Sequence, residues 1–126
     1  ITITITMKNK LKVYISAPVT DHDIKERKRS FAFWSKVLGC LGCEPVNPLE
    51  AVPDDAPTSG EGHESYMKSD LKMLLDCDAI VMFEDWRSSV GCTLEARVAA
   101  GCGIRFIDPR PLLSTGKILF INDILI

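Results

Sequence analysis

The spacing of apolar side chains along the chain alternates between that of a strand and that of a helix. Residues 11–16, within "KLKVYISAP", alternate and stop before a proline, which predicts a strand that ends in a tight loop. The run "DAIVMFE", residues 78–84, is almost continuously apolar, as is typical of a parallel strand covered on both faces. Residues 44–46 and the run "GIRFIDP", residues 103–109, predict two further strands.

Helical spacing fills the segments between these strands. The first predicted helix spans residues 21–39, with Asp21 as its expected N-cap and a basic run at 25–29 on its solvated side. The second helix is predicted at 63–75, and the third, within 90–103, ends at one of two glycines. The apolar stripes consist of Ile24, Phe31, Trp34 and Leu38 in the first helix and Met67, Leu71 and Leu74 in the second.

The order of these elements predicts an α/β protein with a single domain over residues 1–126. We expect a three-layer α/β/α sandwich with a mainly parallel, Rossmann/flavodoxin-like sheet of four to five strands. The apolar tail at 117–126 is either a fifth strand or an interface segment. The segment "ITITIT" is either an extra edge strand or an addition ahead of a natural start at Met7. The loop at 48–62, rich in proline and acids, is expected to be functional or mobile.

Composition restricts the classes of function. The chain has 126 residues, of which 46% are hydrophobic and 25% charged, as expected of one soluble globular domain. The net charge is -2 and no basic cluster suggests a nucleic-acid footprint. No apolar run reaches the roughly 18 residues that span a bilayer, and no secretory signal pattern is visible. We therefore expect a cytoplasmic protein with neither nucleic acid nor membrane as its partner.

The cysteines predict neither a disulfide framework nor a metal site. There are 5 of them, an odd number without framework spacing. Cys40 and Cys43 form a C-x-x-C pair, but no second pair and no nearby histidine completes a zinc site. We expect the cysteines to act as small hydrophobic residues in a reducing compartment, with no metal bound.

Ligands of parallel α/β sheets bind beyond the carboxyl ends of the strands. Several polar residues of this chain follow predicted strands, and Glu95 is a lone acid among small and apolar neighbours in the third helix. If that helix begins near Ser89, Glu95 lies in the cleft rather than on a solvated face. The candidate site residues are Tyr14, Ser16, Asn47, Asp70, Asp85, Trp86, Ser88, Ser89, Gly91 and Glu95.

These residue types predict glycosidic chemistry. The helix N-terminus should keep Glu95 ionised, and a carboxylate so placed can attack an electron-poor carbon. Tyr14 is positioned to hydrogen-bond that carboxylate, and Asp70 is a second carboxyl group that can donate a proton to a leaving group. Two carboxyl groups with these separate roles are what retaining glycosidic cleavage requires. Ser88 and Ser89, at a helix start, offer hydroxyl and N–H groups to an anion.

Each residue also has a purely structural interpretation. Glu95 complements the helix dipole, Asp70 pairs at the surface with Lys68 or another lysine of its helix, and Tyr14 packs in the core. Trp86 rests on the end of the sheet. From composition and periodicity alone, the sequence predicts an α/β domain with an acidic cleft.

Three stretches, in the same order and spacing, resemble the nucleoside 2-deoxyribosyltransferase family: "KVYISAP", "SDLKMLLDCDAIVMF" and "WRSSVGCTLEARVAAGCGI". The likeness spans most of residues 11–107 and is greatest to small relatives with a G-W-x-x-S-x-G-A-x-x-E pattern. By this resemblance, Glu95 matches the glutamate that attacks the anomeric carbon of a 2-deoxyribosyl group. Tyr14 matches the tyrosine that orients it, and Asp70 matches the aspartate that engages the base or assists its departure.

The resemblance also implies a nucleoside or nucleotide as the small-molecule partner, a homodimer or higher homo-oligomer, and no metal or other cofactor. In some members the C-terminal segment of one subunit completes its neighbour's site, a role open to residues 120–126. Ser89 stands where transferases commonly have aspartate and where the branch that hydrolyses deoxynucleoside 5′-monophosphates has a phosphate-binding serine. The first loop, "SAPVT", lacks the glycine and arginine of that branch. By their position in the chain, Asp85 and Trp86 are expected to replace the base contacts of the family.

Three functions stay open at this point. The first is an enzyme that cleaves the N-glycosidic bond of a (deoxy)nucleoside or its 5′-monophosphate, by hydrolysis or base exchange. The second is a non-catalytic nucleotide-binding module that keeps the same cleft. The third is an unrelated α/β interaction protein that works through its apolar tail.

Overall fold

The computed structural model describes residues 10–58 and 63–122 and has the predicted α/β architecture. Within these ranges, five strands form a sheet of order β2-β1-β3-β4-β5, in which β1 to β4 are parallel and β5 is antiparallel to β4. The expected edge strand at 1–6 and the last tail residues, 123–126, lie outside the described residues. The strands are β1 (Lys12–Ser16), β2 (Glu44–Val46), β3 (Ala79–Met82), β4 (Arg105–Ile107) and β5 (Phe120–Ile121).

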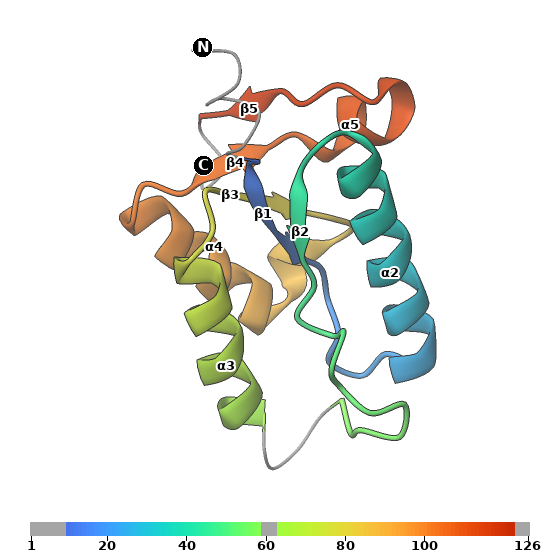
Figure 1. The fold of residues 1–126 in the computed structure, drawn as a ribbon. Coiled ribbons are helices and arrows are strands. Elements are labelled where there is room, and N and C mark those ends of the chain that lie inside the picture. The colour runs from blue at the N-terminus through green and yellow to red at the C-terminus, as the bar shows by residue number, and fades with distance from the viewer. Residues whose placement is uncertain (1–9, 59–62, 123–126) are drawn as a thin grey trace.

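Helices cover both faces of this sheet, which confirms the predicted three layers (Figure 1). α2 and α5 lie on one side, and α3 and α4 lie on the other. A single 3-10 turn, η1, precedes α4 in the described chain. The bounds are α2 (Ile24–Cys40), α3 (His63–Leu75), η1 (Trp86–Ser88), α4 (Val90–Gly101) and α5 (Pro109–Thr115).

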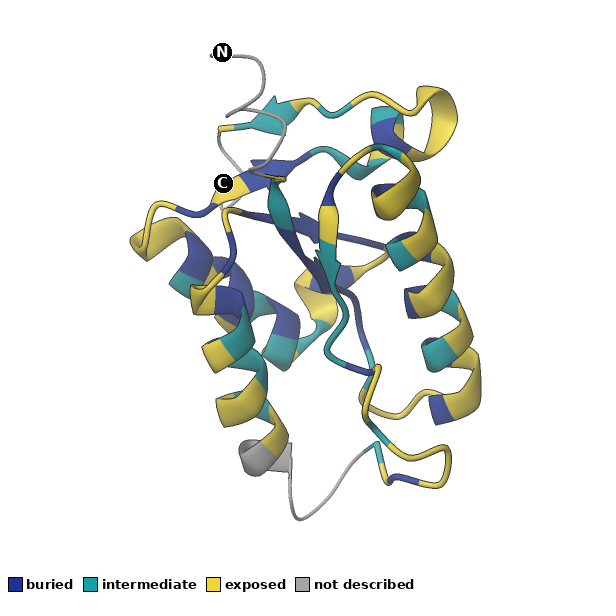
Figure 2. Cartoon of the chain, in the orientation of Figure 1, coloured by how far each residue is buried: buried dark blue, intermediate teal, exposed yellow. Residues whose placement is uncertain are grey.

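The central strands β1 and β3 are buried on both faces, as Figure 2 shows. Because side chains alternate along a strand, β1 sends Val13 and Ile15 into one core and Tyr14 into the other. The first core also holds the aromatic and leucine side chains of α2. The second core holds the small side chains of α4. Because these side chains are small, α4 packs close to β1.

The N-cap of the first long helix lies two residues later than expected. Asp23, not Asp21, is the N-cap, and its carboxylate accepts a hydrogen bond from the Lys25 N–H at 3.1 Å. Asp21 has a φ of 65° and belongs to the preceding turn, in which the His22 N–H donates to the Val19 carbonyl at 3.0 Å. The turn after β1 therefore uses the residue that the sequence pattern assigned to the helix.

The basic run at 25–29 does not lie wholly on the solvated side, as the sequence had suggested. Arg27 is only 3% exposed, because it falls on the same helix face as Ile24 and Phe31. Its guanidinium forms an ion pair with Glu84 and donates to the Pro18 carbonyl at 3.4 Å. This arginine points inward because the loop after β3 presents a carboxylate to it.

The tail contributes a strand, which confirms one of its two predicted roles. β5 pairs with β4, and the Arg105 guanidinium lies 3.4 Å from the centre of the Phe120 ring. The helix α5 before it was not predicted. Asp108 caps that helix, Pro109 begins it, and Gly116 ends it with a φ of 65°.

The cysteines are free thiols, and three of them, Cys43, Cys77 and Cys92, are buried as expected of small hydrophobic residues. Cys40 and Cys102 are exposed, which corrects the prediction for these two. No helix among the described residues is both long and apolar enough to cross a membrane.

Candidate active site

Glu95 lies in the second turn of α4, on the helix face that packs against the sheet. Cys92, Ala96 and Ala99 share this face, and their small side chains let the helix approach β1 closely. Glu95 is 6% exposed. The acid among small neighbours is therefore turned into the protein and away from bulk solvent.

Two hydroxyl groups of β1 hold the Glu95 carboxylate. The Tyr14 hydroxyl donates to Oε2, and the Ser16 hydroxyl donates to Oε1 at 2.8 Å. Tyr14 and Ser16 are two residues apart and so face the same side of the strand. The hydrogen bond expected from Tyr14 is present. Ser16, predicted to bind substrate, contacts the candidate nucleophile, and its part in substrate binding stays a prediction.

The sequence-based electrostatic argument for Glu95 is wrong. The residue lies beyond the first helical turn, where the effect of the helix N-terminus has fallen off, so burial dominates. Burial raises the pKa of Glu95 to about 7, against the hydrogen bonds from Tyr14 and Ser16, which lower it. Burial and the charge of Glu95 also raise the pKa of Tyr14, which keeps its phenol a donor.

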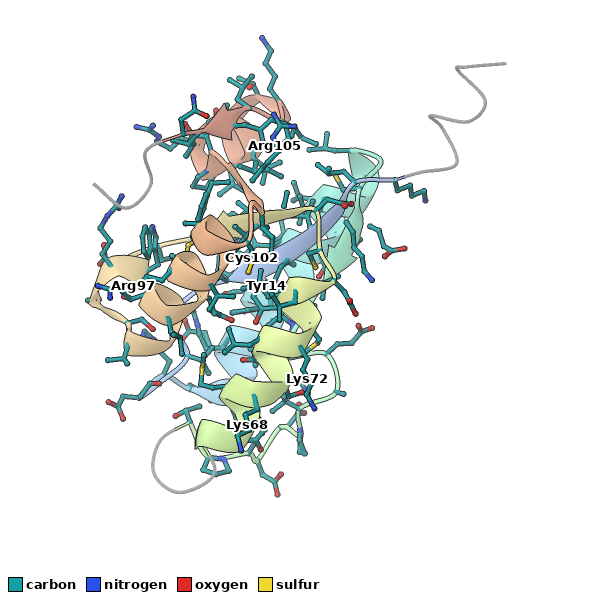
Figure 3. The ribbon with its side chains drawn as sticks, turned by 90° about the vertical axis from the view of Figure 1, so that its left-hand side faces the viewer. Tyr14, Lys68, Lys72, Arg97, Cys102 and Arg105 are labelled. Atoms are coloured by element: carbon teal, nitrogen blue, oxygen red, sulfur yellow. The ribbon has the colours of Figure 1, made fainter. Side chains whose placement is uncertain are left out.

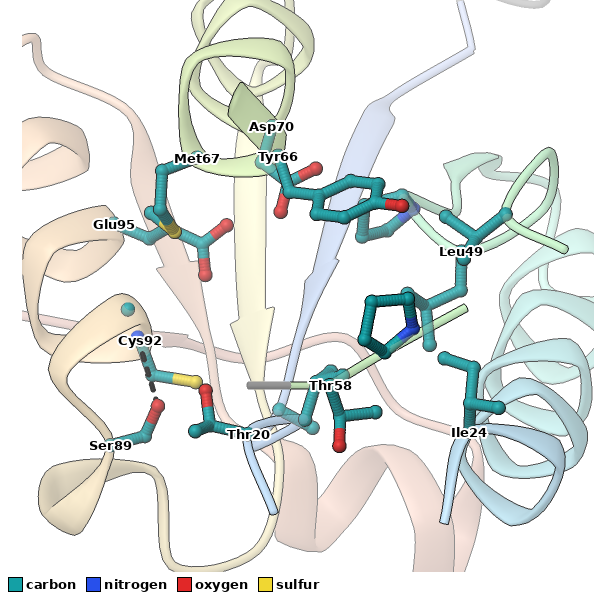
Figure 4. Close-up of a pocket in the computed structure, with 16 residues that line it drawn as sticks. Thr20, Ile24, Leu49, Thr58, Tyr66, Met67, Asp70, Ser89, Cys92 and Glu95 are labelled. Atoms are coloured by element: carbon teal, nitrogen blue, oxygen red, sulfur yellow. Dashed lines mark hydrogen bonds between the residues drawn. The ribbon is translucent and has the colours of Figure 1, made fainter. Parts of the chain in front are cut away.

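Asp70 faces the same cavity from α3, together with Glu95 (Figure 4). Figure 3 shows that Lys68 and Lys72 lie along the outer side of that helix, with Tyr14 behind it. Burial, and then the charge of Glu95, raise the pKa of Asp70 to about 7. The environment of Asp70 therefore favours a place in the cavity over the surface ion pair with a lysine that the sequence also allowed.

The two carboxyl groups differ in what stabilises their charge. Glu95 accepts two hydrogen bonds from hydroxyls, which favour its ionised form. No hydrogen bond contributes to lowering the pKa of Asp70, and the negative charge of Glu95 disfavours ionisation of the Asp70 carboxyl group beside it. Both pKa values are raised to about 7, so the pair holds a proton readily near neutral pH, and the two hydrogen bonds favour the charge on Glu95. That is the division between nucleophile and acid that retaining glycosidic cleavage needs.

The polar groups at the start of α4 are largely used within the chain. Ser89 is the N-cap, and its hydroxyl oxygen accepts from the Cys92 N–H at 3.2 Å. The N–H groups of Ser88 and Ser89 donate to the carbonyls of Asp85 and Trp86, at 3.2 and 3.0 Å. The Ser88 hydroxyl also donates to the Asp85 carbonyl, at 2.8 Å. These serines therefore offer an anion fewer free donors than the sequence suggested.

The cavity that Glu95 and Asp70 share measures about 710 Å³, part of which is open to solvent. In Figure 4, Glu95, Cys92 and Ser89 lie on one side, and Leu49 and Ile24 face them from the other. One end is thus acidic and polar, and the other is apolar.

Of the ten residues singled out in the sequence, Asp70, Ser89, Gly91 and Glu95 line this cavity, and Tyr14 and Ser16 support it from β1. Four others do not line it. Ser88 and Asp85 are exposed, and Trp86 is 6% exposed within the second core, with the Arg87 guanidinium 4.4 Å from its ring centre. Asn47 lies beside a different cavity, and its side chain accepts from the Leu49 N–H at 2.9 Å.

The ten candidate residues do not include the apolar side of the cavity. It is formed by side chains from the first loop, from α2 and from the loop between β2 and α3. The loop at 48–62 had been expected to be functional, but no spacing rule indicates which of its side chains face a ligand. The lining residues outside the ten candidates are Ala17, Val19, Thr20, Ile24, Pro48, Leu49, Val52, Pro57, Thr58, Tyr66, Met67 and Cys92.

Fold and cavity together define an α/β protein in which a buried carboxyl group, Glu95, and a partly buried one, Asp70, share a cavity near the carboxyl end of a parallel sheet. Residues 11–108 match the family described as "Domain of unknown function (DUF4406)". The match covers most of the chain, so the protein belongs to that family. A comparison with functionally curated proteins found no match.

Among solved structures, the chain is similar to a 2-deoxyribosyltransferase from the psychrotolerant bacterium Bacillus psychrosaccharolyticus. The two share 22% sequence identity with a TM-score of 0.55. The similarity covers 86% of this chain and 76% of the other. At this level of identity the comparison establishes a common fold.

Proposed function

We propose that the protein cleaves the N-glycosidic bond of a nucleoside, with Glu95 as the nucleophile and Asp70 as the acid. One observation carries the proposal. The buried carboxylate of Glu95, held by Tyr14 and Ser16, opens on a cavity that contains a second carboxyl group with a pKa of about 7. The resemblance to 2-deoxyribosyltransferases and the shared fold support the same chemistry.

The reaction proceeds in two steps. A lone pair of Glu95 attacks the anomeric carbon as the carbon–nitrogen bond breaks, and the electron pair of that bond leaves with the base. Asp70 gives its proton to the departing nitrogen and becomes a carboxylate. In the second step Asp70 takes a proton from water or from a second base, which attacks the glycosyl ester and frees Glu95. Water gives hydrolysis, and a second base gives exchange.

The charges around the cavity favour an uncharged substrate. The described lining residues include two carboxyl groups and no lysine, arginine or histidine. The N–H groups of Ser88, Ser89 and Cys92 are already bonded within the chain. A phosphate group placed here would lose its hydration beside a carboxylate without a compensating cation. The site therefore supports a nucleoside better than its 5′-monophosphate.

A base-release assay tests this function. Purified protein is incubated with deoxynucleosides and their 5′-monophosphates, with and without a free acceptor base. Glu95→Gln is compared with Glu44→Gln, a matched change at an exposed glutamate of β2. We expect release from nucleosides by the wild type and by Glu44→Gln, and none by Glu95→Gln. Nucleosides that raise the melting temperature without any release of base would instead indicate the non-catalytic binding module.

The homo-oligomer implied by the resemblance stays a prediction. Light scattering of the purified chain, with residues 120–126 present or deleted, measures both the assembly and the part the tail plays in it.

A further inference from the structure

The apolar wall of the cavity is formed largely by the loop that joins β2 to α3. Residues 47–52 fold into consecutive turns, in which the Glu50 N–H donates to the Asn47 carbonyl at 3.2 Å and the Val52 N–H donates to the Leu49 carbonyl at 3.1 Å. Leu49 is 7% exposed and Val52 is partly buried, and both line the cavity. This wall is an ordered surface, although the described part of the loop, residues 47–58, contains no helix or strand.

One lysine of α2 fastens this loop to the helix. The Lys28 ammonium donates to the Val52 carbonyl and forms an ion pair of 2.8 Å with Asp54. The ion pair lowers the pKa of the Asp54 carboxyl. Lys28 does not line the cavity. It contacts the backbone of a residue whose side chain does.

In the proposed reaction the anomeric carbon lies at Glu95 and the leaving base lies at Asp70. Leu49 and Val52 line the same cavity beyond these two carboxyl groups, where the far edge of the base would meet them. Apolar side chains cannot hydrogen-bond a ring edge, but they do favour hydrocarbon substituents on it. This preference depends on the position of the wall, because dispersion contacts between the wall and the base weaken markedly if the gap between them widens by less than about 1 Å.

We propose that Lys28 is a positioning residue that holds this wall in place, and that the wall selects bases that carry an apolar ring substituent. The inference rests on the proposed nucleoside reaction. Lys28 acts through the loop and touches neither the substrate nor the reacting atoms. Because Asp54 is largely exposed, the ion pair itself contributes little to overall stability. By holding the loop, the ion pair affects substrate binding and selectivity.

The test replaces Lys28 by methionine, which keeps the aliphatic stem and removes the charge. The matched control is Lys36→Met, at an exposed position of the same helix. The substrates are two deoxynucleosides whose bases differ by one ring methyl group. We expect the wild type to favour the methylated base in kcat/KM by about fourfold, the worth of one buried methyl group. Lys28→Met should lose this preference and raise KM with kcat little changed, and Lys36→Met should match the wild type. Lys28→Arg, which keeps the charge, should restore part of the preference.

Hydrogen exchange provides a readout that does not need catalysis. The amides of Glu50 and Val52 should exchange faster in Lys28→Met, whereas those of α4 should not change. Unchanged exchange in the loop, or an unchanged methyl preference, would overturn the inference. If the wild type releases no base from any nucleoside, it is the proposed function that fails. In that case, the amide exchange rates of the loop and the binding affinities for the two nucleosides, compared between the wild type and Lys28→Met, still test the role of Lys28.

Discussion

Tyr14 of β1 donates its phenolic hydrogen to Oε2 of Glu95 on α4, and neither side chain is open to bulk solvent. The bond joins the central strand of the sheet to a carboxylate in the second turn of the neighbouring helix. Together with the Ser16 hydrogen bond to Oε1, it fixes the orientation of the carboxyl group and stabilises its ionised form. The proposed nucleophile is thus aimed and charged by a residue 81 positions away in the sequence.

Removing this hydroxyl should slow the reaction more than it weakens binding. Tyr14→Phe keeps the ring in the core but deletes a hydrogen bond to a charged group, so we expect kcat to fall about 10- to 100-fold. KM should change little, because Tyr14 does not line the cavity. Steady-state kinetics measure both, and Tyr66→Phe, at an exposed residue of the cavity lining, serves for comparison. Equal effects of the two changes would contradict the positioning role.

The pH dependence of kcat/KM should be bell-shaped with its maximum near pH 7. The acid limb reports protonation of Glu95 and the alkaline limb reports loss of the Asp70 proton, and both pKa values are raised to about 7. Asp70→Asn cannot donate a carboxyl proton, so the alkaline limb should disappear while overall activity falls. A wild-type profile without an alkaline limb would remove Asp70 from the role of acid.

Asp70 should also make the fold less stable as the pH rises. Its pKa is higher in the folded chain than its ordinary value of 3.8, so the folded state holds the proton more tightly. That contribution is complete below about pH 4 and is lost as the pH rises through about 7. Asp70→Asn should therefore melt close to the wild type at pH 4 and several degrees higher at pH 8. Calorimetry over this pH range measures the difference in melting temperature between Asp70→Asn and the wild type. A difference that becomes smaller as the pH rises would contradict the prediction.

Arg27 should be a main stabilising contact between the loops at the carboxyl end of the sheet. Arg27→Met removes the ion pair with Glu84 and the bond to Pro18, and we expect it to cost about 1–3 kcal/mol of unfolding free energy. Arg29→Met, at an exposed position of the same helix, should change stability far less. Urea denaturation compares the two. Equal losses would mean that the buried guanidinium has no special role.

The elements that the sequence predicted best are those with local signals. β2 and α3 have the predicted bounds, and the apolar run around β3 marked a strand buried on both faces. Glu95 stood out because an acid among small side chains is unusual on a surface helix. Its link to Tyr14 followed from the rule that parallel strands present their carboxyl ends to one cleft.

What the sequence did not reveal depends on distant partners. Arg27 falls on the apolar stripe of α2, but its partner, Glu84, is 57 residues away, and no local rule joins them. The wall formed by Leu49 and Val52 depends on how an irregular loop folds against Lys28. α5 is a different case, because the Asp108 cap with proline at the first helical position was a signal present in the sequence.

The covalent intermediate tests the central claim most directly. Protein mixed briefly with a nucleoside from which it releases base is denatured, digested with trypsin and examined by mass spectrometry. Cleavage after Arg87 and Arg97 yields the peptide of residues 88–97, "SSVGCTLEAR", in which Glu95 is the single acidic side chain. We expect this peptide to carry the added mass of one deoxyribosyl group, and Glu95→Gln to carry none. Base release that continues in Glu95→Gln, or a sugar bound to another peptide, would contradict Glu95 as the nucleophile.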